Sequence, residues 1–190
     1  MTAVEKPQSM TVAQYLESEP RSDLRHEYLG GDVYAMGGAS ARHNIISLNI
    51  AASLRNQLRG GPCTTFIHDM KVRLVADRDT YFYYPDVMVA CDPADNAPFY
   101  RDRPSIIVEV MSESTERIDR REKLFAYRTI PEFNQYVLVD QERVEVTNFI
   151  RAEQGWTSGI LTAAPAVLEF KRIRASIKLS EIYEDSGLAG

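Results

Sequence analysis

The sequence predicts a mixed α/β domain in which a central β-sheet is flanked by α-helices. Apolar residues recur every four positions over residues 41–59, and short β-branched or alternating runs fill residues 64–111. A second helical pattern then precedes further strand-like runs. The length of 190 residues fits one domain that can bury most of its apolar surface without disulfides or structural metal. We expect the domain to span residues 10–184, between short tails at 1–9 and 185–190.

The first third of the chain has the signals of two helices with a hairpin between them. The expected elements are helices at 12–17 and 41–59 and hairpin strands at 26–29 and 32–36. Thr11 and Gln14 form a capping-box pattern, and Ser40 can cap the longer helix. Gly30 and Gly31 supply the positive φ angles that a tight hairpin turn needs.

The rest of the chain is mainly strand-like, with one helix in the middle. The expected elements are strands at 64–75 (a pair or one bent strand), 83–90 and 105–111, a helix at 119–129, a strand at 135–139, a hairpin at 144–151 and 156–162, and a helical turn at 179–183. Asp119 and Glu122 resemble a capping box for that helix, and Pro131 ends it.

Charge and cysteine content restrict the class of protein. The formal charge of −5 disfavours nucleic-acid binding unless the chain carries a local basic face or a metal ion. Cys63 and Cys91 match no CxxC pattern, so we expect reduced, near-core thiols in a cytoplasmic protein. The longest apolar run, residues 87–91, is far too short to span a membrane. We therefore expect a cytoplasmic protein with no membrane partner.

Two acidic residues occupy positions where the strand pattern predicts apolar ones. Asp86 opens the run 87–90, and Glu109 interrupts the run 106–111. Burying an unpaired carboxylate is costly, so each needs a cation, a metal ion or hydrogen-bond donors. If the two strands are neighbours, both carboxylates can reach one Mg²⁺, which prefers oxygen ligands at about 2.1 Å. The alternative is that each acid lies at a strand end and points into water.

Lys123 lies in the first turn of the helix predicted at 119–129. If that helix leans over the strand ends, the ammonium can orient a water nucleophile or offset charge on a phosphorane-like transition state. The alternative is a solvated lysine paired with Asp119 four positions earlier, an interaction of only a few tenths of a kcal/mol.

The order of these residues resembles the PD-(D/E)XK nuclease superfamily: Pro85-Asp86, then 22 residues, then Glu109-Val110-Met111, then Lys123. More closely, the chain is similar to a family of putative restriction endonucleases that is abundant in cyanobacteria. The resemblance covers about residues 10–184, and its most specific segment is IIVEVMSESTERIDRREKLFAYRTIP at 106–131. The other segments on which the resemblance rests are MTVAQYLE, HEYLGGDVYAM, HNIISLNIAASLRNQL, YYPDVMVAC, QYVLVD and LSEIYE.

This resemblance implies a restriction-endonuclease-like core and a homodimeric DNA endonuclease that depends on Mg²⁺ or Mn²⁺. By motif, Asp86 and Glu109 would be the metal ligands, with the carbonyl of Val110 as a third. Met111 stands where the superfamily usually has its lysine, and in this family the lysine lies on the helix, at Lys123. The resemblance thus assigns catalysis to Asp86, Glu109 and Lys123.

Two further polar residues match the family pattern. Glu27, in the first hairpin, could join the metal site or bind a metal-bound water, and an exposed strand glutamate is the alternative. His43, near the start of the second helix, could act as a general base or contact a phosphate. A structural histidine is the alternative for His43.

Three functions remain open. The first is a metal-dependent DNA hydrolase, which basic residues near the predicted helix favour locally: Arg117, Arg120, Arg121, Lys123 and Arg128. The second is a nuclease-fold protein with little or no hydrolysis and a DNA-binding or accessory role, which Met111 and the acidic charge allow. The third is a structural dimer module whose acids form ion pairs with Lys71, Arg73 or Arg128.

Overall fold

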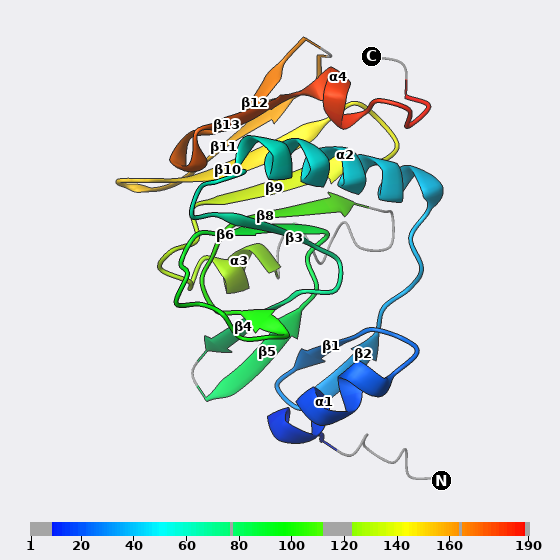
Figure 1. Ribbon diagram of the computed structural model, residues 1–190, viewed down its shortest axis with the longest axis vertical. Coiled ribbons are helices and arrows are strands. Elements are labelled where there is room, and N and C mark those ends of the chain that lie inside the picture. The colour runs from blue at the N-terminus through cyan, green and yellow to red at the C-terminus, as the bar shows by residue number, and fades with distance from the viewer. Residues whose placement is uncertain (1–8, 77, 112–122, 164, 189–190) are drawn as a thin grey trace, which may run out of the picture.

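The computed structural model describes residues 9–76, 78–111, 123–163 and 165–188 (Figure 1). Its helices are α1 (Val12–Ser18), α2 (Ala41–Gln57), α3 (Leu124–Tyr127) and α4 (Leu179–Ile182), with 3₁₀ turns η1 (Glu19–Arg21) and η3 (Lys171–Ile173). Its strands are β1 (His26–Leu29), β2 (Asp32–Ala35), β3 (Thr64–Ile67), β4 (Lys71–Ala76), β5 (Asp79–Tyr83), β6 (Val87–Ala90), β7 (Tyr100–Arg101), β8 (Pro104–Met111), β9 (Gln135–Asp140), β10 (Val146–Ala152), β11 (Gly155–Leu161), β12 (Val167–Phe170) and β13 (Ala175–Lys178).

The central sheet is built from six of the described strands, in the order β11-β10-β9-β8-β6-β3. β8 and β9 run parallel and the other neighbours run antiparallel, so the sheet is mixed. Every residue of β8 is buried, which explains why its sequence is almost continuously apolar. Glu109 is the acidic exception within this strand.

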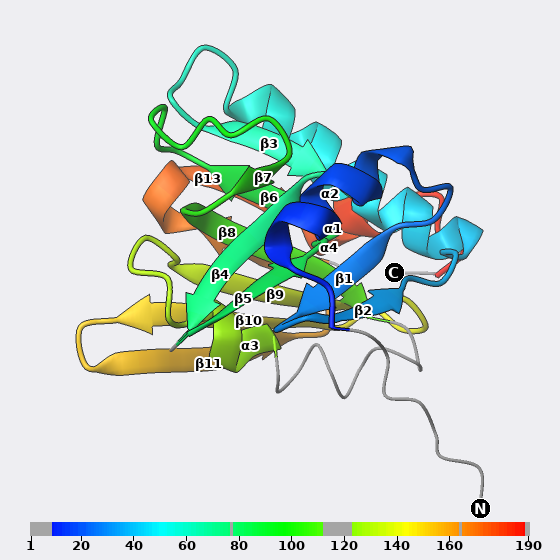
Figure 2. The same ribbon diagram turned by 90° about the horizontal axis from the view of Figure 1, so that it is seen from below.

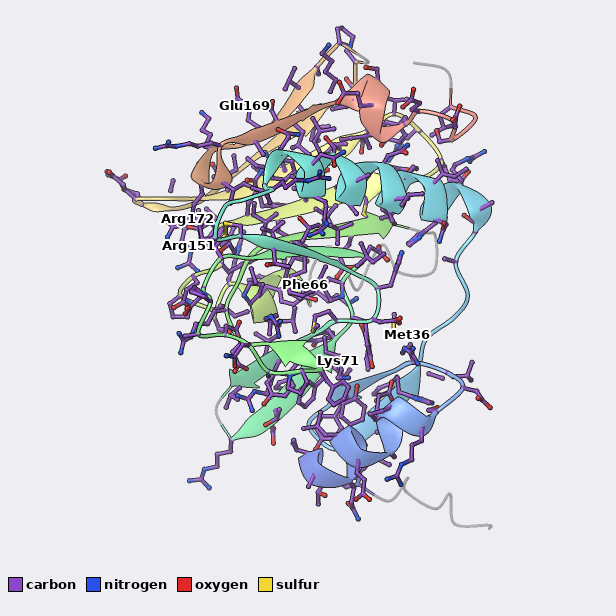
Figure 3. The ribbon with its side chains drawn as sticks, in the orientation of Figure 1. Met36, Phe66, Lys71, Arg151, Glu169 and Arg172 are labelled. Carbon is purple, nitrogen blue, oxygen red and sulfur yellow. A yellow bond between two sulfur atoms is a disulfide. The ribbon has the colours of Figure 1, made fainter. Side chains whose placement is uncertain are left out.

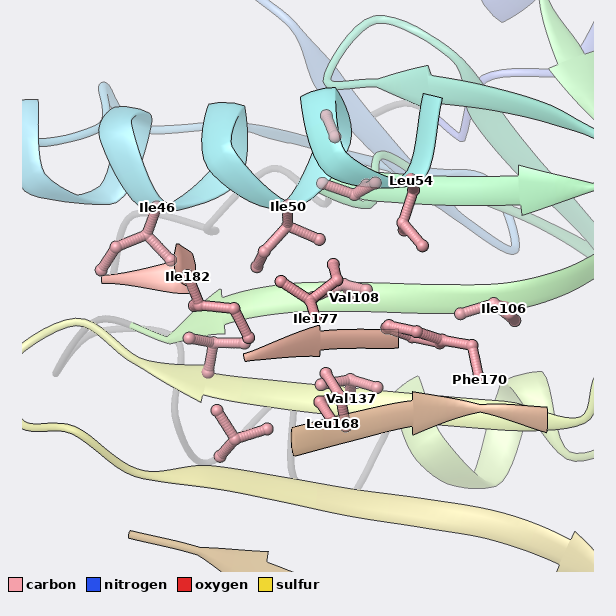
Figure 4. Close-up of a cluster of buried hydrophobic side chains, with 14 of the residues drawn as sticks. Ile46, Ile50, Leu54, Ile106, Val108, Val137, Leu168, Phe170, Ile177 and Ile182 are labelled. Atoms are coloured by element: carbon pink, nitrogen blue, oxygen red, sulfur yellow. The ribbon is translucent and has the colours of Figure 1, made fainter. Parts of the chain in front are cut away.

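One face of the central sheet packs against α2 and the β12–β13 pair. Ile46, Ile50 and Leu54 form the apolar stripe of α2, and Figure 4 shows them directed toward Val108 of β8. Phe170 of β12 belongs to the same core. The four-residue spacing predicted this stripe, because such positions lie on one side of a helix.

The other face of the central sheet meets α3 and a second sheet, whose strand order is β2-β1-β5-β4-β7. The core between them includes Ile107 of β8, Val72 of β4 and Tyr127 of α3. α1 lies on the second sheet (Figure 2). It packs there through Tyr15, whose ring lies 5.2 Å from that of Phe82. A central mixed sheet flanked by helices confirms the predicted fold class.

Two predicted strands have different boundaries from those expected. Residues 64–75 form β3 and β4, which belong to different sheets and do not pair with each other. Residues 83–90 do not form one strand, because β5 ends at Tyr83 and β6 begins at Val87. Pro85 lies between them and has no N–H to donate to a strand neighbour, which accounts for the break.

The expectation of two reduced cysteines is wrong, because Cys63 and Cys91 form a disulfide. They flank the cross-strand pair formed by Thr64 of β3 and Ala90 of β6, so the ladder brings them opposite each other. Both pack against the core under α2, which agrees with the near-core position that the sequence suggested. The redox inference was wrong because spacing along the chain carries no information on cross-strand pairing.

Several expectations fall outside the described residues. These are the tail at 1–8, residues 189–190, the helix start at Asp119 and the basic residues Arg117, Arg120 and Arg121. Among the described helices, none is long and apolar enough to cross a membrane.

Candidate active site

Asp86 and Glu109 lie opposite each other across two neighbouring strands. The antiparallel register pairs Val87 of β6 with Val108 of β8, so the next position along brings Asp86 against Glu109. The backbone N–H of Asp86 donates to Glu109 Oε2 at 3.4 Å. The two acids that the sequence singled out are therefore neighbours at one end of the β6–β8 pair.

Three groups surround the Asp86 carboxylate. The backbone N–H of Val110 donates to Oδ2 at 2.7 Å. His43 Nε2 lies 3.2 Å from the same oxygen, and His68 Nδ1 lies 3.6 Å from Oδ1. The two imidazole rings are 6.3 Å apart. Asp86 is thus fixed from the β8 backbone on one side and faces two histidines on the other.

Helix capping positions His43. Ser40 is the N-cap of α2, and its side chain accepts a hydrogen bond from the His43 backbone N–H at 3.1 Å. The apolar stripe of α2 holds the helix on the central sheet, so its first turn projects over the end of β6 where Asp86 lies. The capping signal and the helical spacing in the sequence together account for this placement.

Lys123 lies between two carboxylates. Its Nζ is 3.0 Å from Glu27 Oε1 and 3.5 Å from Glu109 Oε1. Tyr127, one helical turn later, donates its hydroxyl to Glu109 Oε1 at 3.4 Å. The side chains of Lys123 and Glu109 are only 8% and 4% exposed, so neither is the solvated residue of the alternative interpretations. At such burial, each charged side chain is stable only while its oppositely charged partner is present.

The structure brings together all the residues predicted for the site: Glu27, Asp86, Glu109, Val110 and Lys123, with His43 beside Asp86. The partners proposed for a structural ion-pair module lie elsewhere. Lys71 donates to the Tyr84 hydroxyl at 3.2 Å, and Arg73 donates to Asp102 at 2.7 and 2.8 Å. Arg128 stacks on the ring of Trp156 at 5.1 Å. That third hypothesis is wrong about its cations.

His68 and Tyr127 are contacts that sequence reasoning missed. His68 follows β3 with a φ angle of +40°, which is uncommon for a residue with a side chain. Its backbone N–H donates to the Asp86 carbonyl at 3.2 Å, so the bend and the strand pairing together direct the ring toward Asp86. For Tyr127, the signal was its position four residues after Lys123, on the same side of the helix.

A pocket of about 260 Å³ opens beside Asp86. Asp86, His68 and Tyr84 contribute to its wall, and the segment 36–38 forms part of its rim. Figure 3 labels Met36 where the chain leaves β2 for α2. A Cβ at Gly37 or Gly38 would meet no atom within 4 Å, so this segment leaves the pocket open. The pocket therefore opens Asp86 to solvent from this side.

The donor set is compatible with a hard divalent cation. Among the described residues, no group of three or more His, Cys, Asp or Glu side chains is arranged to hold a metal ion. Mg²⁺, however, is commonly held by one or two carboxylates and keeps several waters. Asp86 and Glu109 meet that requirement because their carboxylates lie on adjacent strands with the pocket beside Asp86. Soft-metal chemistry does not fit, because both cysteines are in the disulfide.

A mixed sheet with two carboxylates on adjacent strands and a lysine beside them is the arrangement expected of a nuclease-like protein with a restriction-endonuclease-like core. The family model Uma2, described as "Putative restriction endonuclease", matches residues 12–172. The chain therefore belongs to this family.

Other proteins are similar to the chain over most of its length. Two uncharacterized proteins of Synechocystis sp., slr1290 and sll1609, are 36% and 32% identical to the chain. The first alignment covers 93% of this chain and 91% of the relative, and the second covers 90% and 97%. The crystal structure of a putative nuclease belonging to DUF820 from Anabaena variabilis superposes with a TM-score of 0.72 at 11% identity. It covers 92% of this chain and 97% of that chain, and it demonstrates a shared fold.

Proposed function

We propose that this protein is a Mg²⁺- or Mn²⁺-dependent endonuclease that hydrolyses phosphodiester bonds in DNA. The observation that carries the proposal is the meeting of Asp86 and Glu109 across β6 and β8, with Lys123 3.5 Å from Glu109. Family membership supports the same reaction class. The pocket beside Asp86 provides an approach for a phosphate.

Asp86 and Glu109 would hold the metal ion, with the carbonyl of Val110 as a third ligand. Because the N–H and C=O of a strand residue face the same neighbouring strand, the Val110 carbonyl lies on the side where its N–H meets Asp86. When bound, the ion would neutralise phosphate charge and make a bound water more acidic. The neighbouring lysine, glutamate and histidine side chains would act around the bound ion.

Lys123 and the two histidines have distinct parts in this proposal. The Lys123 ammonium offsets the charges of Glu27 and Glu109 and can donate to a phosphate oxygen or to the attacking water. Glu27 holds Lys123 at 3.0 Å and so fixes its direction. His43 and His68 contact opposite oxygens of Asp86 and restrain its carboxylate.

A cleavage assay tests the proposal. Supercoiled DNA and an RNA of matched length are incubated with wild type and with Asp86→Asn, Glu109→Gln and their double variant, in Mg²⁺ or Mn²⁺. Glu169→Gln is the matched control, because Glu169 is an exposed carboxylate on β12 (Figure 3). We expect DNA cleavage to fall at least about 100-fold in each site variant, since each removes a charge that holds the cation. Equal cleavage by the double variant would contradict the proposal, and preferential RNA cleavage would contradict the DNA assignment.

A second candidate is a DNA-binding or accessory protein that retains the fold without hydrolysis. The specific observation in its favour is Met111, which is buried at the position of the superfamily lysine. In that case wild type would shift labelled DNA in a gel but leave it uncut in both metals. Detectable cleavage that depends on Asp86 separates the two candidates.

We also propose that the protein is a homodimer, as the family resemblance implies, and that it is cytoplasmic, as the sequence analysis expects. Light scattering coupled to gel filtration tests the first point, with twice the chain mass of 21.5 kDa expected. Subcellular fractionation tests the second. A monomeric mass at all protein concentrations would contradict the dimer.

A further inference from the structure

Two arginines stack on one indole ring near the end of α3. Arg128 and Arg151 lie over Trp156 at 5.1 and 5.3 Å from the ring centroid. Arg151 is the cross-strand partner of Trp156 in the β10–β11 pair. Its Nη2 donates to the carbonyls of Arg128 and Ile130 at 2.9 Å each. Arg151 therefore uses its guanidinium to hold the end of α3 against the central sheet.

Among the described residues, the Arg128 guanidinium forms no comparable hydrogen bonds to backbone carbonyls. Within the part of the chain that the structure describes, its guanidinium lies over Trp156 and Phe125 and forms no ion pair. Its Nε is buried without a hydrogen-bond acceptor there. Burial lowers the pKa of Arg128, whereas carboxylate partners raise the pKa values of other arginines, such as Arg73 beside Asp102. A half-buried cation held by rings alone leaves its terminal N–H groups available to an anion.

Phe125 adds an exposed aromatic face to this cation. It is 68% exposed, and the Arg128 guanidinium lies 5.8 Å from its ring centroid. Aromatic rings beside arginines are typical of surfaces on which unpaired nucleobases stack while a guanidinium binds the adjoining phosphate. An acidic peptide would use the cation but would gain little from the ring face. The combination favours a nucleic-acid strand.

The position of α3 connects this surface to the candidate site. Tyr127, which contacts Glu109, immediately precedes Arg128 along the chain. Lys123, between Glu27 and Glu109, is followed directly by α3. A strand held on Phe125 and Arg128 would therefore contact the same short segment of chain that carries Lys123 and Tyr127.

We propose that Phe125, Arg128 and Trp156 form a binding surface for unpaired nucleotides, with a base on Phe125 and a phosphate on Arg128. This inference rests on the proposed function, because it extends the contact with the same substrate. Trp156 and Arg151 are the rigid support of the surface, and Phe125 and Arg128 are the groups that touch the ligand.

A binding assay without cleavage tests the surface. Fluorescence anisotropy is measured with a labelled oligothymidylate in EDTA, for wild type, Phe125→Ala and Arg128→Gln. Phe99→Ala and Arg172→Ala are matched controls, because Phe99 is 50% exposed and Arg172 is an exposed residue of η3. We expect Kd to rise about 10-fold for Phe125→Ala, since one stacked base is lost. For Arg128→Gln we also expect the dependence of log Kd on log salt to weaken by about 0.7, as for one lost phosphate contact.

The outcomes separate this surface from the proposed catalysis. Wild-type affinity in both Phe125→Ala and Arg128→Gln would overturn the surface, whatever the cleavage assay shows. Binding that needs these two residues would support it even if no metal allows cleavage. Competition by poly-glutamate as strong as that by unlabelled oligothymidylate would overturn it in favour of an acidic protein partner. A blunt duplex that binds as tightly as the single strand would overturn the assignment to unpaired nucleotides.

Discussion

At the scale of single residues, the proposed relocation of the lysine is the main departure from the superfamily pattern. Met111 fills a buried strand position, and Lys123 reaches Glu109 from α3 instead. Because Lys123 also pairs with Glu27, one ammonium serves two carboxylates. The same charge therefore bears on stability as well as on the proposed chemistry.

Replacing Lys123 should destabilise the protein. Lys123→Ala removes the ammonium beside Glu109, whose side chain is 4% exposed, and breaking a buried ion pair in this way costs about 3–5 kcal/mol. Urea denaturation measures the change in the free energy of unfolding. Lys171→Ala, which removes an exposed pair with Glu169, is the control and should change stability by less than about 1 kcal/mol. Equal effects of the two substitutions would contradict the buried pair.

Buried tyrosines predict a loss of stability at alkaline pH. Burial raises the pKa values of Tyr15, Tyr84 and Tyr183 above the ordinary value near 10. Above about pH 10 the native state thus binds more protons than the unfolded chain, so unfolding becomes easier as pH rises. Lys71 acts oppositely, because burial lowers its pKa and its contribution grows until about pH 10.4.

Urea unfolding at about pH 9, 10 and 11 checks this expectation, with tyrosinate absorbance recorded in parallel. We expect stability to fall between about pH 10 and 11, with buried tyrosines ionising only on unfolding. Tyr183→Phe is the control, since it should flatten the fall by removing one of the buried tyrosines. Stability that stays level to pH 11 would argue against these burial effects.

At the scale of elements, the β3–β6 pair links two features of the molecule. One end of the pair carries the Cys63–Cys91 disulfide, and the other leads to His68 and Asp86. The disulfide joins residues 28 positions apart, which restricts the unfolded chain. Reduction of the disulfide is therefore expected to lower the stability of the protein.

Reducing the disulfide should lower the free energy of unfolding by about 3–4 kcal/mol, the chain-entropy value for a loop of this length. Guanidinium unfolding with and without dithiothreitol measures the difference. A variant carrying both Cys63→Ser and Cys91→Ser is the control and should not respond to the reductant. A wild type that unfolds identically under both conditions would indicate free thiols in solution.

The sequence predicted most elements but not how they are combined. Capping residues and periodicity located α1, α2 and β8, because those signals are local. The separation of β3 from β4 into two sheets was missed, since it depends on the bend at His68 and on distant partners. The short strands β7, β12 and β13 were missed as well.

The residues of the candidate site were also predictable only where the signal was local or part of a motif. Asp86 and Glu109 were singled out because they stand at or within apolar runs, and Lys123 because it follows them in the order of the family pattern. His68 was not found because only the β3–β6 ladder brings it to Asp86. Residues with a local or motif signal are predictable, whereas residues placed by pairing alone are not.

At the scale of the whole molecule, the proposed metal site should couple ligand binding to stability. Asp86 and Glu109 come together only in the native state, so Mg²⁺ or Mn²⁺ bound there should stabilise that state by about 1–3 kcal/mol at concentrations of about 10 to 100 times Kd. Differential scanning calorimetry with increasing metal concentration measures the rise in Tm. Asp86→Asn should abolish the rise, and Glu169→Gln should keep it. An equal rise in wild type and Asp86→Asn would place the cation elsewhere.

The site's members are spread along the chain from Glu27 in β1 to Tyr127 in α3, and they come from both sheets. During synthesis, the charged cluster cannot assemble until α3 has emerged and both layers have folded together. A nascent or half-folded chain would thus lack Lys123 beside its carboxylates. For a protein of the proposed activity, this order of assembly delays any nuclease activity until the chain has completed its fold.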